Sequence, residues 1–430
     1  MLKQILTHKI TVLLLLSLLL MLPIQSVMDL NQERQSFRAQ AISSIMTSSS
    51  GPQHLIGPIL VQPYVQTLVE EVDGKTISRE QKVYRYVLPE KLDIQANMQV
   101  TTRKLSIYQA QVYTTRFTIT GNLPTEGIAD ESSSTMVAGQ PYLSMALSDA
   151  RGINSVPELQ LGEQRIPFAP GSWLDGDFAG IHAPLTSYPT TDGTFRIELD
   201  LQGMDNLDIV PVGRDSKLQL TGNWPHPNFI GDFLPSSFKL SAQGFDAQWQ
   251  TSWFATDMEN RFNRLMTENA SSFPSFSVSL VQPVDHYQLN ERAAKYALLF
   301  IGLTFISFFM FELLKGLRVH PIQYALVGMG LVVFYLVLLA LTEHLGFAMA
   351  YLLASGASVV LNGFYLSHVL GGLRQGVGFS ALLGLVYGVL FGLLQAEGNA
   401  LLLGALLLFV VLALIMILTR KLDWYALTNK

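Results

Sequence analysis

The stretch ITVLLLLSLLLMLPIQSVM, residues 10–28, contains no charged side chain. A bilayer core of about 30 Å needs about 20 apolar residues of helix, so this stretch is long enough to cross it once. Its backbone must be helical there, because lipid offers no water to unpaired N–H and C=O groups. Five more apolar stretches of similar length lie toward the other end of the 430-residue chain. They are residues 296–314, 322–341, 347–365, 377–394 and 400–418.

A polar block, residues 29–292, separates the first apolar stretch from the other five. The sequence therefore predicts an α+β membrane protein with six transmembrane helices and a large, mainly β domain inserted between helices 1 and 2. Residues 1–9 form the N-terminal segment, residues 293–418 a bundle of five helices, and residues 419–430 the tail.

The short connections between the apolar stretches predict the orientation of the chain. The basic residues of the N-terminus, of two connections and of the tail are Lys3, Lys9, Lys315, Arg318, Arg374, Arg420, Lys421 and Lys430. The alternate connections, residues 342–346 and 395–399, contain no Lys or Arg. Because basic loops stay in the cytoplasm, both termini are expected inside and residues 29–292 outside. We interpret the first stretch as an uncleaved anchor, since residues 21–26 lack the small residues of a leader cleavage site.

The polar block is acidic, with 19 Lys and Arg against 29 Asp and Glu, whereas the remainder has 9 against 4. An acidic outer domain argues against nucleic acid or anionic lipid headgroups as its ligand. The chain contains no Cys, which excludes disulfides and Cys-based metal sites. A domain of this length can be stabilised by its own core.

The period of apolar residues changes along the polar block. Helical spacing predicts a helix over about residues 29–46, which Ser48-Ser49-Ser50-Gly51-Pro52 ends. From Leu55 a period of two predicts strands, with room for two subdomains separated by the polar stretch 127–139. The expected strands are residues 65–72, 75–87, 105–120, 194–203, 207–211, 217–223, 238–244, 248–254 and 275–281, with a hairpin turn at Asp73-Gly74.

No catalytic or metal-binding motif is recognisable in the chain. Its eight His residues form no HxH or HExxH pattern, and Asp175-Gly176-Asp177 lacks the closing Glu of a calcium loop. GxSxG and P-loop signatures are absent as well. We therefore predict no catalytic residue, no cofactor and no metal, and leave open a hydrolase whose Ser, His and Asp meet only in the fold.

The central thirds of the predicted spans contain no charge, which argues against ion-coupled transport. Glu312 lies near the inner end of the second span. Glu343 and His344 lie at the outer end of the third, either as an interfacial helix end or as a proton-responsive pair. The polar residues of the fourth span, for which we expect interhelical hydrogen bonds, are Ser355, Ser358 and Asn362.

The fifth span carries small residues at every fourth position, which leaves one helix face nearly without side chains. They are Ser380, Gly384, Gly388 and Gly392. Helices in lipid associate through such faces, so we expect helix packing there, within the chain or in a homo-oligomer.

The segment Asn223-Trp224-Pro225-His226-Pro227-Asn228-Phe229 is rigid, because two prolines fix φ on both sides of His226. Trp224 and Phe229 add aromatic surface to it. Two interpretations are open: a stiff turn that closes the domain core, or a recognition surface that contacts a partner or the outer helix ends.

Ordered strings along nearly the whole chain resemble the CreD family of inner membrane proteins, which are described as cell envelope integrity proteins. The strings are Ser49–Gln53 with Gly57-Pro58, Arg151–Ile153, Asn223–Pro227, Gly231–Pro235, Gln282–Tyr287, Arg292–Tyr296, His320–Tyr324, Glu343–Phe347 and Thr419–Tyr425. The resemblance implies an inner membrane protein of Gram-negative bacteria, linked to envelope stress and to the regulon of a two-component system. It implies no catalytic mechanism.

The sequence thus predicts a non-enzymatic envelope protein whose periplasmic domain acts as a scaffold or sensor. Its expected partners are the lipid bilayer, cell-wall or envelope proteins, and a second copy of the chain, with no nucleic acid. The candidate interaction or coupling residues are Trp224, His226, Phe229, Asp285, Glu343 and His344. The alternative is a transporter or lipid-handling protein that uses the helix bundle.

Overall fold

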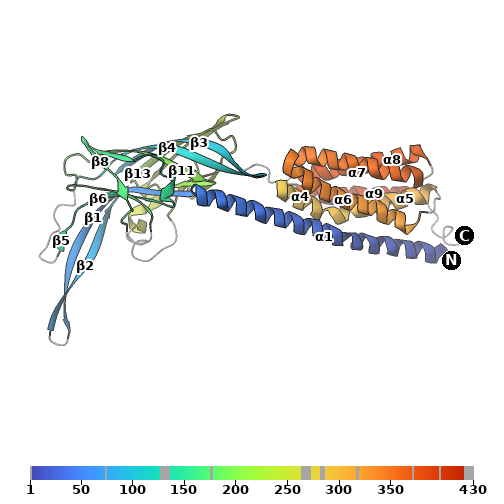
Figure 1. Ribbon diagram of the computed structural model, residues 1–430, viewed down its shortest axis with the longest axis horizontal. Helices are drawn as coiled ribbons and strands as arrows, with labels where there is room; N and C mark the ends of the chain where they lie inside the picture. Colours follow the sequence, from blue (N-terminus) through green and yellow to red (C-terminus); the bar gives the residue numbers. More distant parts are fainter. Residues whose placement is uncertain are drawn as a thin grey trace. The chain divides into compact units, whose positions relative to one another are not determined.

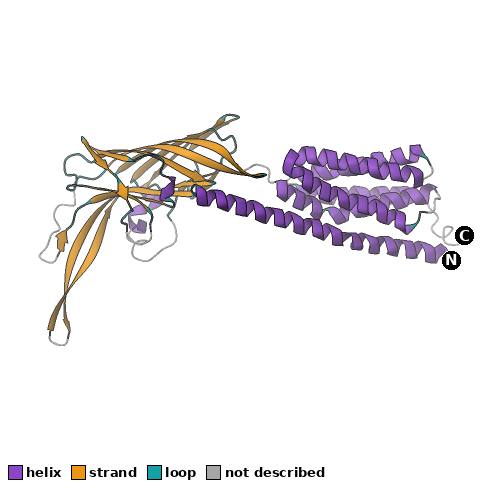
Figure 2. Ribbon diagram, in the orientation of Figure 1, coloured by secondary structure: helices purple, strands orange, loops and turns teal. Residues whose placement is uncertain are grey.

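The computed structural model of the chain describes residues 2–72, 75–125, 136–174, 178–262, 273–280, 286–315, 319–369, 372–396 and 399–420. They belong to two compact units, which are described one at a time. A helical unit comprises residues 1–39 and 284–430, and a strand-rich unit comprises residues 40–283 (Figures 1 and 2). The predicted combination of α-helices with a large sheet-rich domain is confirmed.

Every apolar stretch predicted from the sequence lies within a helix, apart from Tyr296, which lies at the break between α4 and α5. The helices are α1 (Leu2–Ser48), α4 (His286–Lys295), α5 (Ala297–Lys315), α6 (Pro321–Leu345), α7 (Phe347–Val369), α8 (Leu373–Gln395) and α9 (Ala400–Thr419). The helix expected over residues 29–46 is the continuation of α1, so anchor and extension are one element. α1 runs through Pro23, whose nitrogen has no hydrogen to donate to the carbonyl of Leu19.

Four of the described helices, α1, α6, α7 and α8, are long and apolar enough to cross a membrane. α4 and α5 together make a fifth candidate, with a bend of 47° between them. The apolar part of α9 that was searched, Leu402–Ile417, is shorter. Four or five candidate spans are therefore seen among the described residues, and six spans stay a prediction.

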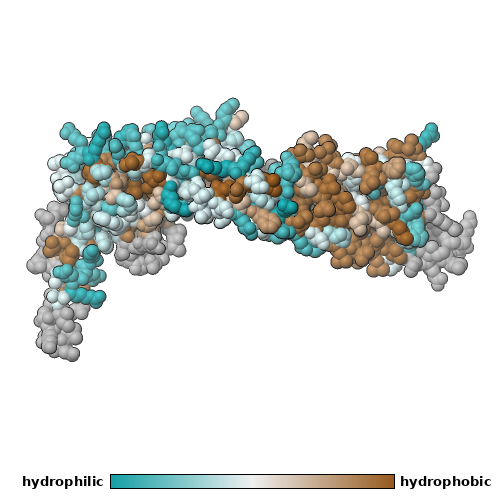
Figure 3. Space-filling model, viewed as in Figure 1, coloured by the Kyte–Doolittle hydropathy of each residue, from teal (hydrophilic) through white to brown (hydrophobic). Residues whose placement is uncertain are grey.

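Aromatic side chains fill the interior of the helical unit. Tyr387 of α8 lies 4.6 Å, centroid to centroid, from both Phe300 of α5 and Phe334 of α6. The outward positions of the same helices carry exposed Leu, Val and Phe, and Figure 3 shows them as an almost continuous hydrophobic surface. Such a surface is costly in water and suits a hydrocarbon environment.

The described residues of the strand-rich unit form two sheets. The strands of the first sheet are β1 (Gln53–Val72), β2 (Lys75–Val87), β5 (Met136–Ala138), β6 (Tyr142–Leu147), β9 (Ala169–Pro170), β10 (Gly180–Pro184), β12 (Asn206–Ile209), β14 (Asn228–Gly231) and β17 (Phe276–Ser279). Those of the second are β3 (Lys91–Leu105), β4 (Tyr108–Asn122), β7 (Glu158–Leu161), β8 (Gln164–Pro167), β11 (Thr194–Met204), β13 (Asp215–Gly222), β15 (Ser237–Ser241) and β16 (Gly244–Ser252).

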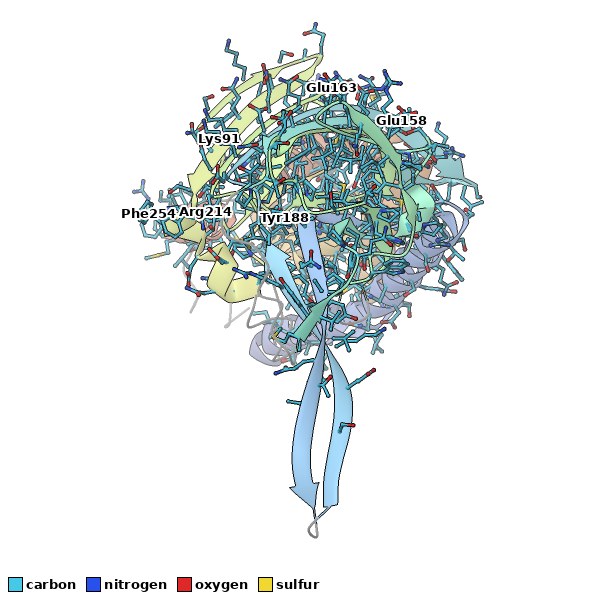
Figure 4. All side chains as sticks on the ribbon, turned by 90° about the vertical axis from the view of Figure 1, so that its left-hand side faces the viewer. Lys91, Glu158, Glu163, Tyr188, Arg214 and Phe254 are labelled. Carbon is cyan, nitrogen blue, oxygen red and sulfur yellow. The ribbon has the colours of Figure 1, made fainter. Side chains whose placement is uncertain are left out.

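β1 organises the first sheet. It pairs in parallel with β12 and antiparallel with β2, β5 and β6. The sheet order is β14-β17-β12-β1-β6-β10-β9, with β2 and β5 as further partners of β1. The far half of the β1–β2 hairpin stands away from the two sheets, as Figure 4 shows end-on.

The second sheet runs β15-β16-β13-β3-β4-β11-β7-β8. Its strand β3 alternates strictly between exposed and buried residues from Lys91 to Val100. One face therefore stays in solvent while the other joins the core. Leu60 of the first sheet and Phe117 of the second belong to the same buried cluster, so the two sheets share one core.

Several predicted strands need correction. The strand expected over residues 105–120 crosses a turn at Ser106, whose φ of 57° ends β3 and allows β4 to begin at Tyr108. The strand expected over residues 248–254 ends at Ser252, because Trp253 opens the short helix α2 (Trp253–Thr256). The pairing of Val72 with Lys75 confirms the predicted hairpin, whereas Asp73-Gly74 and Asp175-Gly176-Asp177 lie outside the described residues.

Candidate functional site

A group of polar side chains gathers where α1, α4 and α6 meet in the helical unit. Glu343, near the end of α6, accepts a hydrogen bond of 3.1 Å from the Tyr287 hydroxyl of α4. Arg34 of α1 lies 3.7 Å from the same carboxylate, whose side chain is 11% exposed. The residues of this polar junction are Asn31, Arg34, Tyr287, Asn290, Thr342 and Glu343.

The polar junction is under-satisfied. Asn31 donates through its Nδ2 to the backbone carbonyl of Tyr287 at 3.2 Å. Two of its buried amide atoms have no hydrogen-bond partner among the described residues: Asn31 Oδ1 and Asn290 Nδ2. A buried polar atom without a partner costs about 1–3 kcal/mol, and such atoms mark bound water, stored strain or a function.

The other candidates near this junction differ in their placement. His344 is exposed at the end of α6, whereas Glu343 faces Tyr287 and Arg34. The structure therefore brings Glu343 together with α1 and α4. Asp285 lies outside the described residues.

The end of α1 is bound tightly within the strand-rich unit. Ile45 packs against Ala110, Val112 and Met204 of β4 and β11. Arg151 donates through its Nη1 to the carbonyl of Thr47 at 2.9 Å, which satisfies one of the last carbonyls of the helix.

Asp149 holds that guanidinium in place. Its carboxylate lies 2.6 Å from Arg151 Nη2, and this side-chain hydrogen bond lowers the pKa of Asp149. Gly152, the next residue, has no room for a side chain, because a Cβ there would overlap the carbonyl oxygen of Gln202. The sequence marked Arg151–Ile153 only as part of a resemblance. Its role as the anchor of α1 comes from contacts 104 residues apart along the chain.

A second anchor of α1 lies at its other end. Lys9 forms an ion pair with Glu312 of α5 and donates to the carbonyl of Val319 at 2.8 Å. Glu312 also accepts from the Tyr324 hydroxyl at 2.8 Å and from the Val319 N–H at 3.1 Å. The sequence placed Lys9 and Glu312 at the same membrane edge but did not pair them. The signal was the acid itself, since a carboxylate in an apolar helix needs a partner.

A run of hydrogen bonds joins α7 and α8 inside the helical unit. The Tyr387 hydroxyl donates to Ser358 Oγ at 2.7 Å, and the Tyr351 hydroxyl donates to the Tyr387 carbonyl at 2.7 Å. Asn362 donates to the Ser358 carbonyl at 2.9 Å. Ser358 thus makes the interhelical bond expected of it. Asn362 and Ser355 instead form hydrogen bonds within their own helix α7, and Ser355 is exposed.

The small-residue face of α8 is open in the single chain. A Cβ at Gly384, Gly388 or Gly392 would meet no described atom within 4 Å. Ser380 differs, because it packs directly against Gly363 of α7. The three glycines therefore do not mediate packing among the described residues, and packing between copies stays a prediction.

The proline-rich segment after β13 fits the interpretation of a stiff turn. The Trp224 indole donates to the His226 carbonyl at 3.0 Å and packs on the domain core. Phe229 lies 5.5 Å, centroid to centroid, from Trp249 in that core. His226 itself is exposed. The predicted contact of this segment with a partner or with the helix ends is not tested.

A cavity of about 530 Å³ opens on the second sheet. Its charged lining residues are Arg116, Arg165, Arg196, Glu158, Glu198 and Asp200. Arg116 pairs with Asp200 at 3.1 Å and Arg196 with Glu198 at 2.8 Å. The three positive and three negative side chains balance, so the cavity has no net charge to select an ion. The described residues contain no group of three or more His, Asp or Glu placed to hold a metal.

Comparison with known proteins gives a consistent relationship over the whole chain. The family model described as "Inner membrane protein CreD" matches residues 5–425. A curated protein of that name from Escherichia coli (strain K12) is 40% identical over 428 residues, which cover 99% of this chain and 95% of the relative.

The solved structures give only a distant likeness. The crystal structure of the M1 zinc metallopeptidase from Deinococcus radiodurans has a TM-score of 0.22 at 7% identity, and the match covers 49% of this chain and 53% of that one. A mutant of the same enzyme has a TM-score of 0.21 at 10% identity, with 38% of each chain covered.

Proposed function

Because this chain belongs to the CreD family of inner membrane proteins, we propose that it supports cell envelope integrity under stress, as a scaffold or sensor without catalysis. The chain is a multi-pass inner membrane protein. In our proposal six helices cross the membrane, both termini are cytoplasmic, and residues 29–292 lie in the periplasm. The basic connections and the apolar surface of the helical unit support this arrangement.

One observation carries the proposal: α1 is a single helix whose two ends are anchored in different units. Lys9 and Asn31 bind it within the helical unit, and Ile45 and Thr47 bind it within the strand-rich unit. After Pro23 the helix continues to Ser48 without another proline, so a displacement of Thr47 can reach Asn31 along uninterrupted helical turns. α1 is therefore suited to couple an event in the outer domain to the membrane helices.

The polar junction supplies the element that such coupling needs. Two of its buried amide atoms, Asn31 Oδ1 and Asn290 Nδ2, have no hydrogen-bond partner among the described residues, so they are available to bond in a shifted arrangement. Movement of α1 would change the contacts of Asn31 and Arg34 with α4 and α6. A ligand or a load on the outer domain would then bias the junction toward one arrangement.

Complementation of a strain that lacks the protein tests this role. Asn31→Ala and Glu343→Gln should reduce survival under envelope stress at unchanged protein levels. Gln32→Ala is the matched control, because Gln32 is exposed on the neighbouring face of α1. Full protection by both junction variants would exclude the coupling role. Equal survival of the strain with and without the protein would exclude the envelope function.

The orientation has its own test. A reporter enzyme that is active only outside the cytoplasm, fused after Asp200, should be active in the proposed topology. Activity of a cytoplasmic reporter at the same position would contradict it.

Transport or lipid handling through the helix bundle is the second candidate function. A polar run lies inside the helical unit. It consists of the hydrogen bonds of Tyr351, Ser358, Asn362 and Tyr387, together with the buried hydroxyl of Tyr335, which has no partner among the described residues. Purified protein in liposomes should move labelled lipid between leaflets if this candidate is correct, and Tyr387→Phe should slow that movement. Wild-type liposomes with the same rate as empty ones would exclude it.

A further inference from the structure

The strand-rich unit contains a second cavity, of about 610 Å³, beside the base of the β1–β2 hairpin. Small-molecule sites in proteins commonly have about 300–1,000 Å³. The lining residues are Pro63, Tyr64, Val65, Lys82, Tyr84, Gly139, Gln140, Tyr142, Trp173 and Leu174. Four of the ten are aromatic, and Lys82 is the one charged residue among them.

Trp173 is presented to this cavity in an unusual way. Its side chain is 58% exposed, although Trp is normally buried. Its φ of 55° lies in the left-handed region, which a bulky residue adopts only where its surroundings enforce it. Two hydrogen bonds of 2.6 Å fix the segment, from the Tyr142 hydroxyl to the Trp173 carbonyl and from Ser144 Oγ to the Ser172 carbonyl.

A neighbouring aromatic ring, that of His182, also supports the indole of Trp173. His182 is buried and stacks on it, with 3.5 Å between ring centroids and an interplanar angle of 23°. The His182 Nδ1 is bonded to the Gly171 carbonyl at 2.6 Å, which holds the imidazole in position. Tyr142 packs edge-on against both rings. A ring fixed in this way loses little freedom when a ligand binds to it.

We propose that this cavity binds a carbohydrate, with one sugar ring stacked on Trp173. A pyranose has a face of C–H groups that packs on an aromatic ring and a rim of hydroxyls that needs polar partners. The indole supplies the first, while Tyr84, Lys82 and Gln140 line the cavity where the second would lie. A lining with a single cation and several polar groups suits an uncharged or weakly acidic sugar better than a lipid tail.

A peptide is the less suitable occupant. Peptides that bind beside a sheet commonly add a strand to a free edge. At this cavity β1 is already paired with β2 through Val65 and Lys82, and with β5 through Tyr64 and Ala138. Recognition must therefore come from side chains, which favours the sugar.

Binding is tested with the purified full-length chain in detergent, by calorimetry. The probes are an N-acetylglucosamine tetramer, as a cell-wall type of sugar, and maltotetraose, as a sugar without N-acetyl groups. A proline decamer is the peptide probe. We expect at least one tetrasaccharide to bind, with the decamer not binding.

Variants locate the site. Trp173→Ala should weaken sugar binding at least about tenfold, and Trp173→Phe should weaken it less. Lys82→Ala should also weaken it, because Lys82 is the charged residue of the lining. The matched control is Trp253→Ala, because Trp253 is also exposed, at 44%, but does not line the cavity. Trp253 lies beside Arg214, which Figure 4 labels at the edge of the unit. The melting temperature of each variant is measured as well, and its binding is calculated per folded molecule.

The proposal is overturned if neither sugar binds, if the decamer binds in their place, or if Trp173→Ala and Lys82→Ala bind as the wild type does. It goes beyond the envelope role and is separable from it. A chain that binds no sugar but still protects cells under stress would refute this site alone.

Discussion

The ion pair of Lys9 and Glu312 leads to a quantitative prediction. Their side chains are only 16% and 9% exposed, so the charges are largely removed from water. Replacing Glu312 by Gln leaves the Lys9 ammonium without its counter-charge, and breaking a buried pair from one side costs about 3–5 kcal/mol. The amide also offers one acceptor where the carboxylate bonds both Tyr324 and Val319, which adds about 1 kcal/mol. We expect Glu312→Gln to lower the free energy of unfolding by about 4 kcal/mol or more.

The measurement is unfolding of the purified chain in mixed micelles, followed by the loss of helical circular dichroism as the denaturing detergent fraction rises. Lys9→Met should be destabilising for the same reason. The double variant removes both charges, so it should be more stable than the sum of the single effects predicts, by about 2 kcal/mol. Single variants within about 1 kcal/mol of the wild type would show that the pair behaves as an exposed one and would refute the reasoning. Additive single effects would do so too.

Three further predictions concern the anchor of α1 and the open face of α8. Gly152→Ala should lower the Tm of the chain by several degrees, because its Cβ would overlap a backbone carbonyl, whereas Gly51→Ala, with open space around it, should not; equal Tm values would contradict this. The folded pKa of Asp149 lies below its unfolded value of about 3.9, so its stabilisation is present above that pH and is lost as the pH falls through the folded pKa. Asp149→Asn should therefore flatten the acid limb of a stability-against-pH curve measured by denaturant titration, and an unchanged limb would exclude this role. Gly388→Leu should leave the Tm nearly unchanged and weaken association between copies in crosslinking, so a large drop in Tm would contradict the open face.

The helices could be predicted from the sequence because their signal is local. A run of about 20 apolar residues has one stable form in lipid, whatever its neighbours do. The predicted spans accordingly fall inside helices apart from Tyr296, with residues 377–394 within α8 and residues 347–365 within α7. The predicted helix ends were less accurate. Lys9 was assigned to the segment before the first helix, but it lies inside α1 and pairs with Glu312, which is far away in the chain.

The sheets could be predicted only in part. Alternation identifies a strand but not its neighbour, so the parallel pairing of β3 with β13 could not be derived from either strand. β3 itself was missed although Leu92, Ile94 and Met98 alternate with polar residues, which is the signal that would have revealed it.

The candidate sites were the least predictable part. Glu343 was chosen for its position at a helix end, and its partners Arg34 and Tyr287 come from segments some 300 and 56 residues away. No sequence pattern indicated a site at Trp173, because Gly171 and Ser172 before it are residue types typical of turns. Its exposure and its stacking on His182 appear only in the folded chain.

Among the helices that the structure describes, α1 is the one with a proline in its interior, Pro23. The missing hydrogen bond to Leu19 falls between the fastened points at Lys9 and Asn31, so bending is cheapest there. The part of α1 before the proline, which Lys9 anchors, is therefore not rigidly tied to the part that carries Asn31. Replacing Pro23 by alanine would restore the hydrogen bond and stiffen the helix at this position without changing either anchor.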